Sequence, residues 1–263
     1  MFLAVNSWSA VSGALFAAAI TTAAHAEPPC PGNADALGTA RVLDVDAATT
    51  PRVGRKQFPQ TLPLAPKEVV LSFDDGPWPT TTERILDALR AECVRATFFL
   101  IGRNALARPA LAQRELAEGH TVAYHSFSHP MLDRMPIAAA QADIEHGIAA
   151  VNTALGDQAG HAPAQFFRFP YFASSPPLLD WLERRRMAVF GADLWASDWN
   201  PMSPDQELRL ILERVEASSG GIVLFHDTKA QTAAMLPAFL RTLKARGFSI
   251  VDVVDAGLQP RSQ

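Results

Sequence analysis

Short apolar runs alternate with longer amphipathic stretches along most of the chain, from residue 68 onward. The apolar runs have the length of strands and are rich in β-branched and aromatic residues, which predicts buried strands. Seven strands are expected, at residues 68–73, 96–101, 120–124, 165–169, 188–193, 221–225 and 248–254. Six helices are expected, at residues 81–92, 104–118, 137–155, 177–186, 205–217 and 231–246. This alternation predicts one α/β domain with about seven parallel strands and helical crossovers, either open or closed as a barrel.

The stretch before this region has a different pattern. Residues 27–67 contain seven prolines, at positions 28, 29, 31, 51, 59, 63 and 66. Proline breaks helices and is disfavoured in central strands. We therefore predict an extended N-terminal segment at 27–67, followed by the main domain at 68–263.

The first residues have the composition of a targeting signal. Residues 1–26 contain no Lys, Arg, Asp or Glu and include an apolar stretch at Val11–Ile20. Ala24 and Ala26 supply the small residues that signal peptidase requires before its cut. This predicts a signal peptide at 1–26 and export to the periplasm or the medium. The segment lacks the usual basic start, so an uncleaved membrane anchor is the alternative interpretation.

Composition excludes several classes of protein. The chain is 48% hydrophobic and 19% charged, with a net charge of −4, which is too apolar for a disordered chain. A pI near 6.0 gives no basic footprint for nucleic acid. The body has no apolar run of the roughly 20 residues that span a bilayer, so no stable membrane insertion is expected after cleavage. The two cysteines, Cys30 and Cys93, form either one disulfide or two separate thiols.

Polar side chains follow the apolar runs at five predicted strand ends. In a parallel α/β fold the carboxyl ends of the strands share one face, and functional groups collect there. The five clusters are Asp74–Pro77, His125–His129, Arg168–Tyr171, Asp193 with Asp198–Trp199, and Leu224–Asp227. We therefore expect them to form one site.

Two of these clusters have the composition of a metal site. His125 and His129 are four residues apart, which places them on one face of a helical turn, and one carboxylate completes a His2Asp set. Such a set leaves positions open for water and substrate, as in catalytic zinc sites. Taken alone, the histidines could start a helix and bond to backbone, and Asp74–Pro77 could be a plain turn. Together they favour a metal site, because adjacent carboxylates at a strand end are unfavourable unless something uses their charge.

The five clusters resemble, in order, the five motifs of the polysaccharide deacetylases, carbohydrate esterase family four. The matching segments are SFDDGP, HSFSH, RFPY, Asp198–Trp199 and LFH, and the resemblance covers about residues 68–253. The family includes chitin, chitooligosaccharide, peptidoglycan and acetylxylan deacetylases. The resemblance implies a distorted (β/α) barrel and metal-dependent removal of acetyl groups from sugars. The implied cofactor is zinc or another divalent cation such as cobalt.

The resemblance also implies roles for the residues at the first strand ends. Asp74 resembles the general base, and Asp75, His125 and His129 resemble the metal ligands. One of two neighbouring carboxylates can bind a metal while the other takes a proton from the attacking water. Arg168 would orient Asp74 and keep it ionised, because an opposite charge lowers the pKa of a carboxyl group.

A second set of residues would act on the substrate. His226 resembles the general acid, which amide hydrolysis requires because an amine leaves poorly unless protonated, and Asp198 would tune it. The backbone N–H of Tyr171 would help to hold the oxyanion, and Leu224 would line the acetyl pocket. Trp199 offers a flat face that suits a pyranose ring, with core packing as the alternative.

The chain departs from the family pattern at two points. The fourth motif is usually Asp-x-x-Asp-Trp, but four residues separate Asp193 from Asp198 here. Either could support His226, and Asp198 is preferred because Trp199 follows it. The third motif usually continues with glycine, where this chain has Phe172, and the bulkier residue is expected to reshape the substrate entrance.

Three classes of function agree with these motifs. The first is a metal-dependent N-deacetylase acting on N-acetylglucosamine units of chitooligosaccharide or peptidoglycan. The second is an O-acetyl esterase acting on xylan or another exopolysaccharide with the same groups. The third is a sugar-binding protein that has lost turnover, which the intact set of five acidic and histidine residues disfavours.

Overall fold

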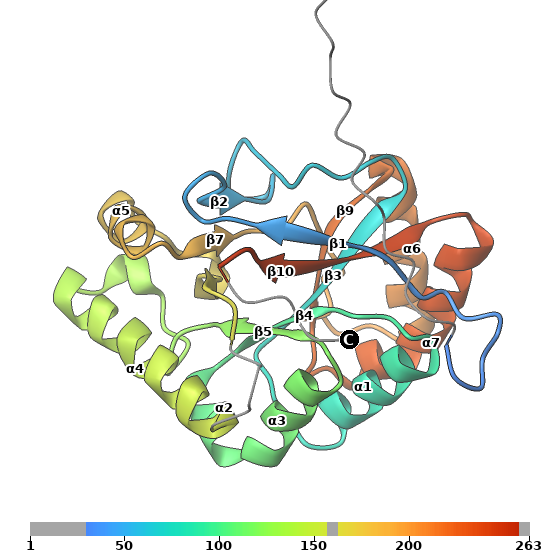
Figure 1. Cartoon of the computed structure of the whole chain (residues 1–263), viewed down its shortest axis with the longest axis horizontal. Coiled ribbons are helices and arrows are strands. Elements are labelled where there is room, and N and C mark those ends of the chain that lie inside the picture. Colours follow the sequence, from blue (N-terminus) through green and yellow to red (C-terminus); the bar gives the residue numbers. More distant parts are fainter. Residues whose placement is uncertain (1–29, 157–162, 258–263) are drawn as a thin grey trace, which may run out of the picture.

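A parallel sheet runs through the middle of the computed structural model, and helices pack around it on the left, below and on the right in Figure 1. The structure describes residues 30–156 and 163–257. The predicted signal peptide at 1–26 lies outside these residues. Every strand pairing within them is parallel. The predicted α/β fold with parallel strands and helical crossovers is confirmed.

The sheet of the described residues has ten strands rather than about seven. The expected strands are present as β3 (Glu68–Asp74), β4 (Thr97–Leu100), β5 (Thr121–Tyr124), β6 (Phe166–Phe167), β7 (Ala188–Phe190), β9 (Gly220–His226) and β10 (Ser249–Asp255). The additional strands are β1 (Thr39–Val45), β2 (Arg52–Val53) and β8 (Leu194–Trp195).

The strands run in the order β1-β10-β3-β4-β5-β6-β7-β2, and β9 and β8 branch from β3. β9 pairs with β3 along its whole length, and β8 pairs with β9. In the part of the chain that the structure describes, no ladder joins β7 to β8. The barrel that the resemblance implies is therefore not closed by backbone hydrogen bonds.

The N-terminal segment belongs to this sheet, which the sequence did not predict. β1 pairs with β10, and β2 pairs with β7, so both ends of the main ladder are strands from residues 39–53. The prolines of the segment all fall outside the two strands, so every residue of β1 and β2 keeps a backbone N–H that can pair in the sheet. A boundary at residue 67 therefore does not separate the segment from the domain.

Seven α-helices cover the sheet within the described residues. They are α1 (Thr81–Ala91), α2 (Gly102–Ala107), α3 (Pro109–Ala117), α4 (Ile137–Leu155), α5 (Pro176–Arg184), α6 (Pro204–Ser218) and α7 (Ala230–Ala245). The single helix expected at 104–118 is wrong, because the chain forms α2 and α3 there. Arg108, with a φ of −139°, ends the first helix, and Pro109 starts the second, because proline is favoured at the first position of a helix and disfavoured in its interior.

Phenylalanine rings support the strands that lead to the candidate site. Phe73 of β3 stacks between Phe98 of β4 and Phe225 of β9, with ring centroids 5.1 and 5.5 Å apart. All three rings are buried. Burial of large aromatic side chains contributes strongly to core stability, so the packing of these rings stabilises the arrangement of β3, β4 and β9.

Cys30 and Cys93 form a disulfide. Their Cα atoms are 5.6 Å apart, within the usual range for such a bridge. The bridge ties the start of the described chain to the residues just after α1. Of the two arrangements that the sequence allowed, the structure has the disulfide.

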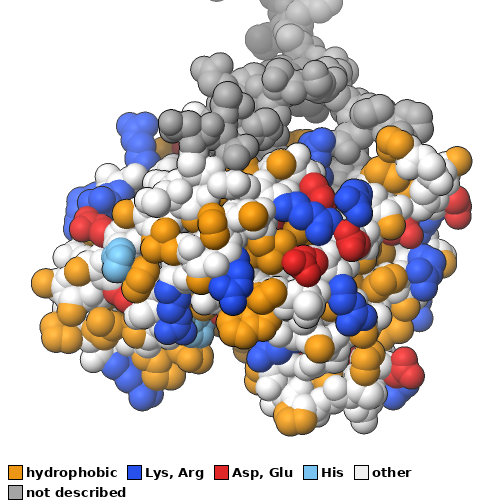
Figure 2. Space-filling view, turned by 90° about the horizontal axis from the view of Figure 1, so that it is seen from below, with side chains coloured by type: hydrophobic (Ala, Val, Ile, Leu, Met, Phe, Trp, Pro, Cys, Tyr) orange, Lys and Arg blue, Asp and Glu red, His pale blue; other side chains and the backbone are white. Residues whose placement is uncertain are grey.

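Charged side chains of both signs are interspersed with hydrophobic and neutral ones on the described part of the face drawn in Figure 2. This agrees with the small net charge of −4. Among the described residues, none of the helices has both the length and the apolar character needed to cross a membrane.

Candidate active site

The predicted strand-end clusters meet at the carboxyl end of the sheet. Asp74 ends β3, and Asp75 follows it directly. His125 follows β5, and His226 ends β9, which lies beside β3. Arg168 follows the short strand β6. The expectation that these groups share one face is confirmed by the register, which pairs Asp74 with His226.

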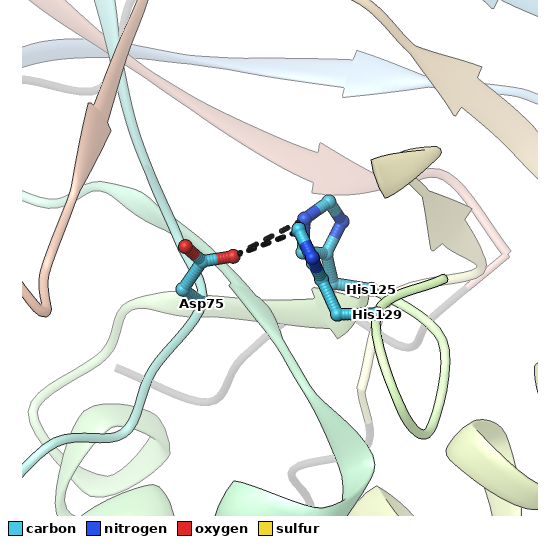
Figure 3. A group of neighbouring side chains, drawn as sticks. All are labelled: Asp75, His125 and His129. Atoms are coloured by element: carbon cyan, nitrogen blue, oxygen red, sulfur yellow. Dashed lines mark ion pairs between the residues drawn. The ribbon is translucent and has the colours of Figure 1, made fainter. Parts of the chain in front are cut away.

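Asp75, His125 and His129 converge on one point, with both imidazole rings turned toward the carboxylate (Figure 3). Asp75 Oδ1 lies 3.5 Å from His125 Nε2 and 3.2 Å from His129 Nε2. One ligand atom from each of the three residues lies within 4.8 Å of the others. His125 is buried, and the other two are partly exposed, so the point is open on one side.

The hydrogen bonds of this group leave lone pairs facing the shared point. His125 Nδ1 lies 2.7 Å from the carbonyl oxygen of Arg168, and a carbonyl only accepts, so Nδ1 carries the proton. In the neutral ring, Nε2 then presents its lone pair to Asp75. Asp75 Oδ1 is buried and has no hydrogen-bond donor among the described residues. The three ligand atoms fit a divalent cation, because a bound cation would remove the repulsion between their lone pairs.

Opposing effects act on the pKa of Asp75. Burial raises it, but the imidazole groups of His125 and His129, within 3.5 Å of Oδ1, lower it well below the usual range of a carboxyl group. Asp75 is therefore ionised, as a metal ligand requires.

The two histidines are on a loop, and the prediction of a helical turn is wrong. Ser126 and His129 both have positive φ angles, 62° and 60°, which a right-handed helix does not allow. The backbone N–H of His129 donates to Ser126 Oγ at 3.0 Å and closes the loop. The i, i+4 spacing brings the residues together through this compact loop.

Asp143 of α4 stabilises the same loop by accepting hydrogen bonds from it. Its carboxylate accepts from the backbone N–H of Phe127 at 3.0 Å and from Ser128 Oγ at 2.6 Å. Gly147, one turn further along α4, lets the loop approach closely. A Cβ atom there would lie 2.4 Å from the backbone carbon of Ser126. Asp143 and Gly147 were not singled out in the sequence, because nothing local distinguishes them from other polar and small helix residues.

Arg168 is fully buried and donates to Asp74. Its Nη1 lies 2.7 Å from Asp74 Oδ1 and 2.9 Å from Ser72 Oγ. Its Nε and Nη2 donate to the carbonyl oxygens of Phe190 and Gly191, at 3.1 and 2.8 Å. The guanidinium thus spans from β3 to the end of β7, where the ladder is open. The second oxygen of Asp74, Oδ2, lies 3.9 Å from His125 Nε2, beside the proposed ligands.

His226 is hydrogen-bonded to Asp198 rather than to Asp193. His226 Nδ1 lies 2.7 Å from Asp198 Oδ1. Burial lowers the pKa of His226, but the hydrogen bond and charge of Asp198, together with the charges of Asp75 and Asp74, raise it to about 9. Asp193 has a different position, because its carboxylate accepts from Thr61 Oγ1 and from the backbone N–H of Ile222. His226 therefore carries a proton at neutral pH.

The remaining expected residues lie around these groups. Tyr171 is 62% exposed, has a φ of 56°, and packs its ring edge-on against His129 with centroids 4.6 Å apart. Trp199 is 46% exposed and stands perpendicular to His226 at 5.9 Å. Leu224 is buried in β9, where it pairs with Trp195 of β8. With nearly half of its surface exposed, Trp199 does not fit the alternative of core packing.

An aromatic row extends from His226 toward the N-terminal segment. Trp199 contacts Trp195 edge-on at 5.7 Å, and Trp195 stacks against Phe172 at 6.2 Å. Lys56 Nζ lies 4.8 Å from the centre of the Trp195 ring. Phe172, which stands where the family usually has glycine, is thus part of this row.

Comparison with known proteins identifies relatives of this arrangement. A family profile for polysaccharide deacetylase matches residues 62–188. A chitooligosaccharide deacetylase of Sinorhizobium fredii is 33% identical over 195 residues, which are 69% of this chain and 88% of that protein. A peptidoglycan-N-acetylglucosamine deacetylase of Listeria monocytogenes is 33% identical over 187 residues, or 71% of this chain. The chain spans 38% of the length of that relative.

A solved structure has the same fold. The peptidoglycan deacetylase of Bdellovibrio bacteriovorus superimposes with a TM-score of 0.73 and 33% sequence identity. The match covers 83% of this chain and 59% of the other.

Proposed function

The chain belongs to the polysaccharide deacetylase family, and we propose on this basis that it hydrolyses acetyl groups from N-acetylglucosamine units of peptidoglycan or chitooligosaccharide. The observation that carries the proposal is the pairing of two neighbouring carboxylates with different surroundings. Asp75 faces two histidines, whereas Asp74 is held by Arg168. Relatives named as deacetylases of both substrates support the substrate class.

Asp75, His125 and His129 would hold a divalent cation, with zinc as the first choice and cobalt as a substitute. A neutral His pair with one carboxylate is a donor set typical of catalytic zinc. When bound, the ion supplies positive charge that polarises the acetyl carbonyl and eases deprotonation of the attacking water. Each of these three side chains then serves to hold and orient that charge.

Asp74 acts as the general base in this proposal. Its Oδ1 is occupied by Arg168 at 2.7 Å, while Oδ2 lies on the side of the proposed ligands, 3.9 Å from His125 Nε2. The free oxygen is therefore the one that takes the proton of the attacking water. The rigid contact with Arg168 fixes the direction in which that oxygen points.

His226 acts as the general acid. Its Nδ1 is bonded to Asp198, so Nε2 is left to donate a proton to the leaving nitrogen. With a pKa of about 9, the ring is protonated at neutral pH and can make this donation. Amide hydrolysis needs it, since an amine leaves poorly without a proton.

Four further residues complete the proposed substrate site. The backbone N–H of Tyr171, whose ring packs against His129, would donate to the oxyanion of the tetrahedral intermediate. Leu224 would line the pocket for the acetyl methyl group. Trp199 and Trp195 would pack against pyranose rings, because flat apolar faces with polar edges suit them.

We also propose that the protein works outside the cytoplasm. The sequence of residues 1–26 supports export through a signal peptide. The disulfide between Cys30 and Cys93 supports the same location, because such bridges persist in oxidising compartments.

The experiment is an acetate-release assay on purified, zinc-loaded protein. The substrates are peptidoglycan, chitooligosaccharides of increasing length, and acetylxylan. Acetate from the N-acetylated substrates, stopped by a chelator and restored by zinc, is the expected result. Release from acetylxylan alone would replace the proposal with an O-acetyl esterase. Binding without any release would replace it with a sugar-binding protein.

A further inference from the structure

Behind His226, a chain of buried side chains leads away from the proposed reaction site. Asp198 bonds to the His226 ring through Oδ1, and its Oδ2 lies 3.0 Å from Thr232 Oγ1. Thr232 Oγ1 in turn lies 2.8 Å from Glu207 Oε1. Thr232 belongs to α7 and Glu207 to α6, and both are 0% exposed. Four side chains from three elements and one loop thus form a single line.

Counting protons along this line shows that both contacts of Thr232 are hydrogen bonds only when one carboxyl group is neutral. The hydroxyl of Thr232 has one hydrogen, but it lies within hydrogen-bond distance of a carboxyl oxygen on each side. If Asp198 and Glu207 were both ionised, one of them would face an oxygen lone pair at 3.0 Å or less. A buried contact of that kind is unfavourable, so the arrangement favours a proton on one of the two carboxyl groups.

The surroundings of the two carboxyl groups identify Glu207 as the one that holds the proton. Asp198 accepts from the backbone N–H of His226 at 2.7 Å as well as from the ring. Among the described residues, the carboxyl group of Glu207 has a hydrogen bond only with Thr232, and its Oε2 is buried without a hydrogen-bond partner. The titratable groups that face Glu207 are Asp198 and His226, and α7 faces it with Thr232.

Electrostatics supports the same choice. Burial raises the pKa of Glu207 to about 7, against the lowering effect of the Thr232 hydrogen bond. The charge of Asp198 raises this pKa further, and that of His226 lowers it. Glu207 therefore gains and loses its proton near neutral pH.

We propose that Glu207 is a positioning residue for the acid, which gives or withdraws a hydrogen bond to Asp198 through Thr232 and thereby sets the acidity of His226. The inference rests on the proposed role of His226 as general acid. When Glu207 is neutral, its O–H donates to Thr232, and the hydroxyl of Thr232 donates to Asp198. Asp198 then accepts a further hydrogen bond, which stabilises its negative charge. It therefore holds the proton of His226 less strongly, and His226 releases that proton more readily.

Ionised Glu207 has the opposite effect. The hydroxyl of Thr232 turns toward Glu207, so Asp198 loses a donor and a second negative charge lies behind it. His226 then holds its proton more tightly. A unit charge a few hydrogen bonds away, at an effective dielectric constant of about 20, shifts a pKa by about one unit.

The test is an NMR titration of the His226 ring in zinc-loaded protein, with Glu207→Gln as the main variant. Glutamine is neutral and still donates to Thr232, so it imitates protonated Glu207 at every pH. The His226 midpoint should fall by about one pH unit in this variant, and the alkaline limb of N-deacetylation should fall with it. Glu213→Gln is the matched control, because Glu213 is exposed on the same helix, and it should leave the midpoint unchanged.

Thr232 supplies the second half of the test. In a Thr232→Val background Glu207 has no hydrogen-bond partner and stays neutral. Glu207→Gln then exchanges one neutral group for another and should leave the His226 midpoint unchanged. In a Thr232→Ser background the hydroxyl is kept, and the shift should return. An equal shift in both backgrounds would overturn the proposal, as would no shift from Glu207→Gln in the wild-type background.

The wild-type protein provides a measurement that needs no variant. Its His226 resonance should show a second, smaller inflection near pH 7 as Glu207 ionises, and the absence of this inflection would overturn the proposal even if Glu207→Gln does not fold. If the titrations behave as described but acetate release does not follow His226, the coupling stands and the role of His226 as acid fails.

Discussion

Arg168 Nη1 lies 2.7 Å from Asp74 Oδ1, and both side chains are buried. The same guanidinium donates to Ser72 and to two carbonyl oxygens near the end of β7. Arg168 therefore fixes the proposed base and joins two strands that no ladder connects in the described chain. A single side chain serves both the stability of the fold and the geometry of the site.

Arg168→Lys should reduce both stability and activity. Lysine keeps the charge beside Asp74 but cannot reach all the acceptors that the planar guanidinium satisfies. Leaving buried carbonyl groups unpaired should lower the free energy of unfolding by about 2–5 kcal/mol, measured by urea denaturation. Arg185→Lys is the control, since Arg185 is exposed, and it should change stability by less than about 0.5 kcal/mol. A variant at position 168 as stable and active as wild type would contradict this account.

His226→Ala should separate amide from ester hydrolysis. An amide nitrogen must be protonated to leave, whereas an aryl acetate releases a stable phenolate without help. N-acetyl hydrolysis should therefore fall by about 10²- to 10⁴-fold, while much of the aryl esterase rate is kept. The remaining esterase rate should still respond to a chelator. Equal losses in both reactions would mean that His226 positions substrate or supports the fold.

Asp198→Asn should move the alkaline limb of the pH profile to lower pH. His226 acts in its protonated form, so activity falls as pH rises through its pKa of about 9. Asp198 raises that pKa, and removing its charge makes His226 lose its proton at lower pH. Initial rates of N-deacetylation between pH 6 and 10 measure the shift, with Asp193→Asn as the control that leaves the limb in place. An unshifted limb in the Asp198 variant would show that another group is the acid.

Replacing Cys30 and Cys93 with serine should weaken the fold but spare the chemistry. The disulfide closes a loop across a separation of 63 residues, and its contribution to stability is about 4 kcal/mol in the chain-entropy model. The free energy of unfolding should fall by up to that amount, while kcat at 25 °C is unchanged. A reducing agent should lower the stability of the wild-type protein and leave the double variant unaffected.

The parallel fold and the meeting of five polar clusters follow from the sequence, because strand-length apolar runs and strand-end polar groups are local patterns. β1 and β2 were missed because the prolines around them dominate the composition of residues 27–67. The break between α2 and α3 was missed although Pro109 marks it. Each error comes from judging a stretch by its average pattern instead of by the residue that decides its backbone.

Residues behind the site were harder to find from sequence. Asp143 and Thr232 act through contacts between distant segments, which a single sequence does not show. The sequence pattern contains one indication of Glu207, because it lies on the same buried stripe of α6 as Ile211 and Val215, at a spacing of four residues. An acidic residue in an otherwise apolar stripe indicates a buried polar partner.

The central claim is that the two adjacent carboxylates have different tasks, and the metal content of Asp74→Asn and Asp75→Asn proteins tests it most directly. Zinc per chain is measured by elemental analysis after dialysis, and acetate release is measured on the same samples. Asp74→Asn should keep close to one zinc per chain and lose about 10²- to 10⁴-fold in turnover. Asp75→Asn should lose the metal, and excess zinc should restore part of its activity. Metal loss in Asp74→Asn with full loading of Asp75→Asn would contradict the account.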